Sequence, residues 1–112
     1  MKRFTKLLAG SAIASGLMFA QAYAADTIKI GVAGPLTGPN AVFGEQVYDG
    51  VAAYVNGVNA AGGINGKKIE LIKGDDACEP KQAIAVANHF VDQDKVQAVI
   101  GHFCSSSTIP AS

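Results

Sequence analysis

Residues 96–108 have the sequence VQAVIGHFCSSST, and this stretch decides the fold. Its first five residues are mainly apolar and β-branched and are followed by Gly101, a pattern that predicts a strand over residues 96–100. Four consecutive hydroxyl residues at 105–108 then predict a helix start, because Ser and Thr oxygens can accept hydrogen bonds from its free N–H groups. The same junction can hold a small anion, since N–H groups and the positive end of the helix dipole point toward it. Two interpretations of the serines are open here, a helix cap and a ligand site.

The N-terminal segment is predicted to be a cleaved signal peptide, residues 1–24. Three basic residues within the first six supply its positive end, residues 7–20 are mostly apolar, and Ala-Tyr-Ala at 22–24 provides the small residues that signal peptidase requires. An uncleaved membrane anchor is the alternative, but the apolar stretch is short for a hydrocarbon core of ~30 Å. We therefore expect the exported chain to begin at Ala25.

The charge of the exported part argues against nucleic-acid binding. The whole chain has nine basic and nine acidic residues, and three of the basic ones lie in the signal peptide, which leaves a net charge of −3. The remaining lysines form no basic run of the kind that follows a phosphate backbone. No second apolar segment is long enough to cross a membrane.

The chain contains two cysteines, Cys78 and Cys104. Export to an oxidising compartment favours a bridge between them. A zinc site would have to recruit His89 and His102, which lack the spacing of metal ligands. A redox role is disfavoured because neither cysteine lies in a C-x-x-C motif. We predict a structural disulfide.

The rest of the exported part alternates predicted strands and helices. We predict strands over residues 27–33 and 68–72, each followed by an amphipathic helix, and the charges of the second strand are typical of a position near a sheet edge. Pro80 suits the first position of the second helix, and His89 lies off its apolar face and should be solvated. The residues expected to be buried are Val47, Val51, Tyr54, Val55 and Val58 in the first helix and Ala83, Ile84, Ala87, Phe90 and Val91 in the second.

This βαβαβ order predicts an α/β fold, the incomplete start of a three-layer α/β/α lobe with parallel strands and right-handed crossovers. In such sheets ligands bind beyond the carboxyl ends of the strands, where the strand order reverses. With the strand order 2-1-3, that point lies between the first and third strands, and loops 34–43 and 102–108 flank it. The serines therefore lie beside a predicted crevice. The loops with Cys78 and Cys104 must lean across the end of the first strand to form a disulfide.

No motif for catalysis stands out. The glycines within residues 31–38 lack the spacing of a dinucleotide-binding turn, and residues 66–68 lack the hydroxyl of a phosphate-binding loop. Ser105 has no flanking glycines of a nucleophile elbow. Asp75 and Asp76 could act as a general base or as metal ligands, but we interpret them as a solvated turn. We expect no enzyme activity, no cofactor and no metal.

Two cysteine-containing stretches, residues 75–88 (DDACEPKQAIAVAN) and 101–108 (GHFCSSST), closely resemble the periplasmic Leu/Ile/Val-binding proteins, the substrate-binding components of branched-chain amino acid ABC transporters. Residues 30–39 and 59–66 are similar to the wider class of two-lobed type I periplasmic binding proteins. The resemblance implies that residues 25–112 are the N-terminal part of the first lobe of a ligand-binding domain. It also implies a periplasmic monomer that captures Leu, Ile or Val and delivers it to a membrane permease.

The resemblance also implies roles for individual residues. Cys78 and Cys104 match the disulfide of the family, and Ser105 matches the serine whose hydroxyl binds the α-carboxylate of the ligand. Phe43 lies where the family places an aromatic residue, often Trp, against the ligand side chain. Ser106 is a further ligand-binding candidate. The remaining ligand groups of the family would lie beyond the last residue of this chain.

Two alternative functions fit the same fold class. One is the ligand-sensing domain of an amino acid or amide receptor, which would carry a transmembrane segment and a signalling domain downstream. The other is a small secreted enzyme of flavodoxin-like fold, whose hydroxyl-rich loop would bind a phosphate or a flavin. The sequence downstream of residue 112 would discriminate between a transport protein and a receptor.

Overall fold

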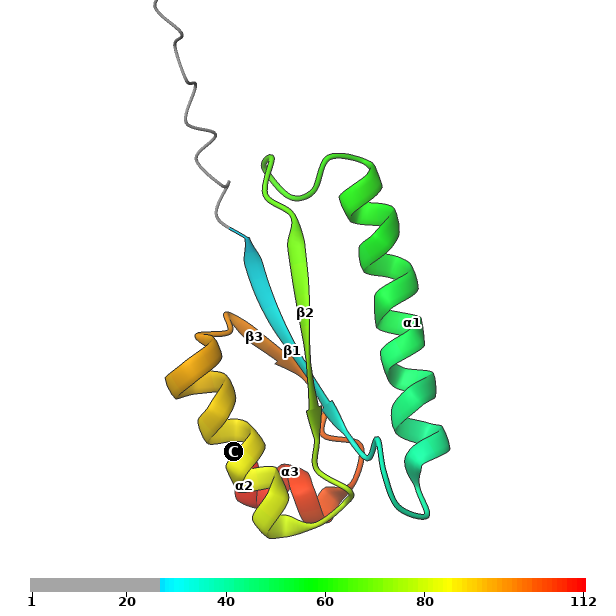
Figure 1. Ribbon diagram of the computed structural model, residues 1–112, viewed down its shortest axis with the longest axis vertical. Helices are drawn as coiled ribbons and strands as arrows, with labels where there is room; N and C mark the ends of the chain where they lie inside the picture. The colour runs from blue at the N-terminus through cyan, green and yellow to red at the C-terminus, as the bar shows by residue number, and fades with distance from the viewer. Residues whose placement is uncertain (1–26) are drawn as a thin grey trace, which may run out of the picture.

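Figure 1 shows the computed structural model, which describes residues 27–112, so that the predicted signal peptide, residues 1–24, lies outside the described residues. Among the helices of this described part, none has the length and apolar character needed to cross a membrane. The elements in chain order are β1 (Ile28–Gly34), α1 (Ala41–Ala60), β2 (Ile69–Asp75), α2 (Pro80–His89), the π-helical turn η1 (Phe90–Asp94), β3 (Ala98–Ile100) and α3 (Ser105–Ala111).

The three strands form one parallel sheet, as predicted, and their order is β2-β1-β3, the order on which the predicted crevice depends. β1 pairs with β2 along its whole length, ending with Gly34 opposite Asp75. β3 pairs with the middle of β1, ending with Val32 opposite Ile100. The carboxyl ends of the three strands therefore lie at one edge of the sheet, with β1 between the other two.

Helices cover both faces of this sheet: α1 lies on one side, and α2 and α3 lie on the other (Figure 1). The core beneath α2 is built around Phe90, which is 2% exposed. A Cβ at Gly31 would come within 2.6 Å of the Phe90 ring, and a Cβ at Gly74 within 2.7 Å. Two glycines of neighbouring strands thus provide the space that the ring occupies. The other buried apolar residues are Val32, Ala33, Val55, Ile69 and Ala83.

Two strands differ in length from the prediction. β2 continues to Asp75, because residues 73–75 keep pairing with β1. β3 is shorter and begins at Ala98, since the N–H of Val96 still donates to the carbonyl of Phe90 at the start of η1, at 3.0 Å. The longer β2 places Asp75 at a strand end and not in a loop, and this difference matters for the site.

The buried faces of the two longer helices are narrower than predicted. Tyr54 is 76% exposed, Ile84 42% and Val91 65%, so their assignment to the core is wrong. Each of them follows or precedes a buried residue, and one step along a helix turns the side chain by about 100°. His89 is exposed, as predicted, and pairs with Asp94 at 2.7 Å. The other predicted core positions are buried or half-buried: Val47, Val51, Val55, Val58, Ala83, Ala87 and Phe90.

Candidate functional site

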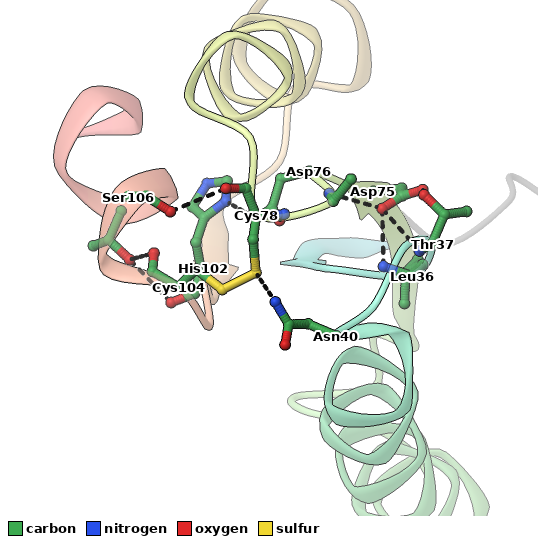
Figure 2. A network of polar contacts seen from close by, with 11 residues as sticks. Leu36, Thr37, Asn40, Asp75, Asp76, Cys78, His102, Cys104 and Ser106 are labelled. Carbon is green, nitrogen blue, oxygen red and sulfur yellow. Dashed lines mark hydrogen bonds and ion pairs between the residues drawn. A yellow bond between two sulfur atoms is a disulfide. The ribbon is translucent and has the colours of Figure 1, made fainter.

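Loops from β1, β2 and β3 meet at the carboxyl edge of the sheet, where the crevice was predicted (Figure 2). The first turn of α1 packs directly on the loop that follows β1, because a Cβ at Gly44 would overlap the carbonyl oxygen of Pro35. A side chain larger than that of glycine would push the helix away from the loop. The close approach places the neighbouring Phe43 at this edge.

The predicted disulfide between Cys78 and Cys104 is confirmed, and its Cα atoms are 5.5 Å apart. It joins the loop after β2 to the residue that precedes α3, and so crosses the end of β1 as the strand order requires (Figure 2). The side-chain amide of Asn40, at the start of α1, donates to Cys78 Sγ at 3.5 Å. All three loops therefore meet at the disulfide.

Asp75 holds the loop that follows β1. Its Oδ1 accepts hydrogen bonds from the backbone N–H groups of Leu36 at 2.8 Å, Thr37 at 3.3 Å and Ala77 at 3.0 Å. Its Oδ2 accepts the hydroxyl of Thr37 at 2.6 Å. Burial raises the pKa of Asp75, but the hydrogen bonds from Thr37, Leu36 and Ala77 together outweigh this effect and leave the pKa below its usual value. The carboxylate thus acts as an anchor for the β1–α1 loop.

Asp76 holds the loop that follows β3. It is fully buried, its Oδ1 accepts the backbone N–H of Cys78 at 2.8 Å, and its Oδ2 lies 2.5 Å from His102 Nδ1. The His102 side chain is 6% exposed. The prediction that Asp75 and Asp76 form a solvated turn is therefore wrong, because the end of β2 lies next to two loops that need acceptors. Within residues 27–112 we find no group of three or more side chains that could hold a metal ion.

The hydroxyl residues of α3 do not cap the helix. The N-cap residue is Cys104, and no side chain forms a cap hydrogen bond there. Ser106 Oγ donates to the carbonyl of Cys78 at 3.0 Å, and Thr108 Oγ1 lies 3.0 Å from the carbonyl of His102. Ser107 is buried, and its Oγ has no partner among the described residues. Ser105 is exposed at the first position of α3. The interpretation of the serines as a helix cap is thus wrong. The hydroxyl proton of Ser106 is donated to the carbonyl of Cys78 and so is not free for a ligand.

Two phenylalanine rings link the loops on either side of the crevice. Phe43, from the first turn of α1, stacks on Phe103, from the loop after β3, with ring centroids 5.2 Å apart and an interplanar angle of 8°. Both rings are exposed, at 45% and 50%. Phe103 lies two residues before Ser105, so an apolar surface and an exposed hydroxyl belong to the same edge. Phe103 was not among the predicted site residues, although its position between the third strand and Cys104 places it in a loop that flanks the predicted crevice.

Two hollows of the described surface border this region: Asp75 lines one of them, and His102 and Thr108 line the other. One of about 360 Å³ lies between β2 and α2 and is lined in part by Lys73, Gln82 and Val86. Another of about 220 Å³ lies beside β3 and is lined in part by Val91 and Val99. Phe43, Phe103 and Ser105 line neither of these two hollows.

Replacing Asp75 with Asn should lower the free energy of unfolding by about 1–2 kcal/mol at neutral pH, because hydrogen bonds to a charged acceptor become neutral ones. The folded-state pKa of Asp75 lies below the unfolded one. Its contribution is therefore fully present above the unfolded pKa of about 3.9 and is lost as the pH falls through the folded value. Urea unfolding at several pH values between 7 and 3 measures both effects.

The matched control for this prediction is Asp49→Asn, which changes an exposed carboxyl on α1. We expect Asp49→Asn to leave the unfolding free energy within about 0.5 kcal/mol of the wild type. The difference between wild type and Asp75→Asn should shrink in acid. A constant difference from pH 7 to pH 3 would show that the charge of Asp75 is not what holds the loop.

A family model described as "Periplasmic binding protein" matches residues 27–111. The chain is 60% identical to an "Amino acid binding protein" of Pseudomonas aeruginosa, with 99% of this chain and 29% of the relative covered. It is 48% identical to the "Leu/Ile/Val-binding protein" of Escherichia coli K12, with 92% of this chain and 29% of the relative covered.

Solved structures show the same likeness. One is the branched-chain amino acid transporter substrate binding protein LivJ from Streptococcus pneumoniae in complex with isoleucine. It matches with a TM-score of 0.73 and 40% sequence identity, and the match covers 77% of this chain and 25% of that one. The present chain thus spans about three-tenths of the length of the curated relatives it matches, 29% in each of the two cases above.

Proposed function

Because the chain belongs to the periplasmic binding protein family, we propose that the whole protein captures a branched-chain amino acid in the periplasm and delivers it to the permease of an ABC importer. The observation that carries this proposal is the stacked pair of Phe43 and Phe103 beside the exposed Ser105 at the carboxyl edge of the sheet. An apolar surface next to a hydroxyl donor suits an amino acid with an aliphatic side chain. The names of the relatives at 60% and 48% identity support the same ligand class.

Ser105 is the proposed partner of the ligand carboxylate. Its side chain is exposed and takes no part in a helix cap, so its hydroxyl can donate to a carboxylate oxygen. Ser106 is less suited, because its hydroxyl proton is donated to the carbonyl of Cys78 at 3.0 Å. A carboxylate can only accept hydrogen bonds, so it needs a donor whose proton is not already used. We therefore assign the carboxylate to Ser105 alone, and Ser106 ties α3 to the loop after β2 through the carbonyl of Cys78.

The two phenylalanine rings are the proposed surface for the ligand side chain. Burying a leucine-sized side chain contributes about 1.5–3 kcal/mol. Phe43 and Phe103 offer two ring faces at 45% and 50% exposure, which a ligand and a second lobe would cover. Closure of two lobes over a ligand by a hinge is a known type of switch, and the closed form would be what the permease recognises. The proposed protein is a monomer, exported through a signal peptide over residues 1–24, with neither a cofactor nor an enzymatic activity.

Ser105→Ala should weaken the binding of leucine, isoleucine and valine to the full-length protein by about 1.5–3 kcal/mol, the range for a hydrogen bond to a charged group. This corresponds to a roughly 10- to 150-fold increase in Kd. Titration calorimetry with each amino acid measures the change. Ser106→Ala is the matched control, and we expect its Kd to stay within about threefold of the wild type.

The ligand class and the role of Ser105 are contradicted by different results. A wild-type protein that binds none of the three amino acids rejects the ligand class. If the wild type binds these amino acids and Ser105→Ala has an unchanged Kd, Ser105 is not part of the site, but the ligand class is retained. A loss in Ser106→Ala as large as in Ser105→Ala would mean that the two hydroxyls share the carboxylate.

A further inference from the structure

A buried pair of titratable side chains, Asp76 and His102, lies next to the candidate site and has no role in the ligand contacts proposed above. Asp76 is 0% exposed, and the side chain of His102 is 6% exposed. Asp76 follows the end of β2 and His102 precedes α3 in the loop after β3, so the contact spans the end of β1 (Figure 2). Such a pair is costly to bury unless its hydrogen bonds are made, and it therefore calls for an explanation.

The polar atoms that face each other in the Asp76–His102 pair form hydrogen bonds, and so does the second oxygen of Asp76. A carboxylate can only accept, so His102 Nδ1 carries the hydrogen that faces Asp76 Oδ2. The other oxygen of Asp76 accepts the N–H of Cys78 at 2.8 Å. The hydroxyl of Thr108, one turn into α3, lies 3.0 Å from the backbone carbonyl of His102 and 3.1 Å from that of Cys104, so the two carbonyls share its proton. His102 is thus held through its side chain and in turn holds the helix through its carbonyl.

The segment that these bonds hold carries both proposed ligand groups. Phe103 follows His102 directly, and Ser105 lies three residues after it. We propose that Asp76 and His102 are positioning residues, which orient the Ser105 hydroxyl toward the ligand carboxylate. This inference rests on the proposed function and names the residues that give the site its selectivity for a carboxylate.

The disulfide alone does not fix this segment. It attaches the segment to the loop after β2 at one residue, Cys104. The hydrogen bond from Ser106 to the carbonyl of Cys78 also acts after Cys104, whereas the contact between His102 and Asp76 holds the segment at a second point, two residues before the disulfide. Two points define the direction of the segment, and this direction decides where the hydroxyl of Ser105 lies. The pair should therefore matter for binding even when the disulfide is intact.

The experiment compares leucine with leucinol, which has a hydroxymethyl group in place of the carboxylate, by titration calorimetry on the full-length protein. His102→Ala removes the contact to Asp76, whereas His102→Asn keeps an amide N–H donor near the place of Nδ1. In His102→Ala we expect the Kd of leucine to rise at least tenfold and that of leucinol to change less than threefold. His102→Asn should recover most of the leucine affinity. Circular dichroism and mass spectrometry confirm folding and the intact disulfide.

Equal losses for leucine and leucinol in His102→Ala would show a merely structural role and overturn the inference, as would an unchanged Kd for leucine. If His102→Ala does not fold, Asp76→Asn, which keeps an acceptor for Cys78 but removes the charge, should show the same selective loss. If neither variant folds, the pair serves folding alone and the inference is wrong. A wild type that binds none of leucine, isoleucine and valine overturns the proposed function and this inference together, whereas a binding wild type with non-selective variants overturns the inference alone.

Discussion

Replacing Phe90 with alanine is expected to lower the free energy of unfolding by about 3–5 kcal/mol, the range for a buried Phe→Ala change. The ring is 2% exposed and lies between α2 and two strand glycines, Gly31 and Gly74. Neither glycine has a side chain that could move into the vacated space. The cavity would therefore stay open, which places the expected loss toward the upper part of the range.

The neighbouring residue offers a matched control for this prediction. Val91 is apolar but 65% exposed, and Val91→Ala should change the unfolding free energy by less than about 1 kcal/mol. Urea unfolding followed by circular dichroism, with equal slopes for all variants, measures both changes. Equal losses for Phe90→Ala and Val91→Ala would contradict the packing described here, because they would mean that the region collapses around the missing ring.

The arrangement of the strands could be predicted from sequence because it follows from local patterns and one topological rule. Three short apolar runs separated by two helical patterns leave parallel strands with right-handed crossovers as the natural solution. The order β2-β1-β3 then places the loops after β1 and β3 on either side of the crevice. The disulfide followed from export and from the presence of two cysteines, and it is confirmed.

The roles of Asp75 and Asp76 could not be predicted because they depend on the length of β2. Successive side chains of a strand point to opposite faces of the sheet. Since β2 reaches Asp75, the two carboxylates diverge: Asp75 turns toward Thr37 on the α1 side, and Asp76 turns toward His102 on the α3 side. The predicted strand ended at residue 72. Residues 73–75 have no clear strand pattern, so the two adjacent acidic residues were interpreted as part of a polar loop.

The contact between Phe43 and Phe103 could not be predicted from the sequence for a different reason. The two residues are separated by the first two crossovers, and their distance depends on how closely α1 approaches the loop after β1. That approach is set by Gly44, whose missing side chain admits the carbonyl of Pro35. Nothing in a local pattern distinguishes such a glycine from one that merely weakens a helix. The candidate site was therefore located by topology, but the residues that shape it needed coordinates.

Replacing both Cys78 and Cys104 with serine is expected to lower the free energy of unfolding by about 3.5 kcal/mol, from the chain-entropy model for a loop of this length. The two cysteines are 26 residues apart, so the bridge closes a loop that contains all of α2 and β3. Without it the unfolded chain gains freedom, while the folded state keeps Asp76–His102 and Ser106–Cys78 as non-covalent links between the same loops. The folded structure should therefore persist with a reduced stability.

The measurement is urea unfolding of the exported full-length protein, wild type and double variant, each with and without reductant. Reductant should lower the stability of the wild type to that of the double variant and should leave the double variant unchanged, because both treatments remove the same constraint. Mass spectrometry of peptides from the alkylated wild type should show the thiols of Cys78 and Cys104 blocked from alkylation before reduction and both alkylated afterwards. A double variant as stable as the oxidised wild type would contradict the chain-entropy account, because it would mean that the bridge removes no freedom from the unfolded chain.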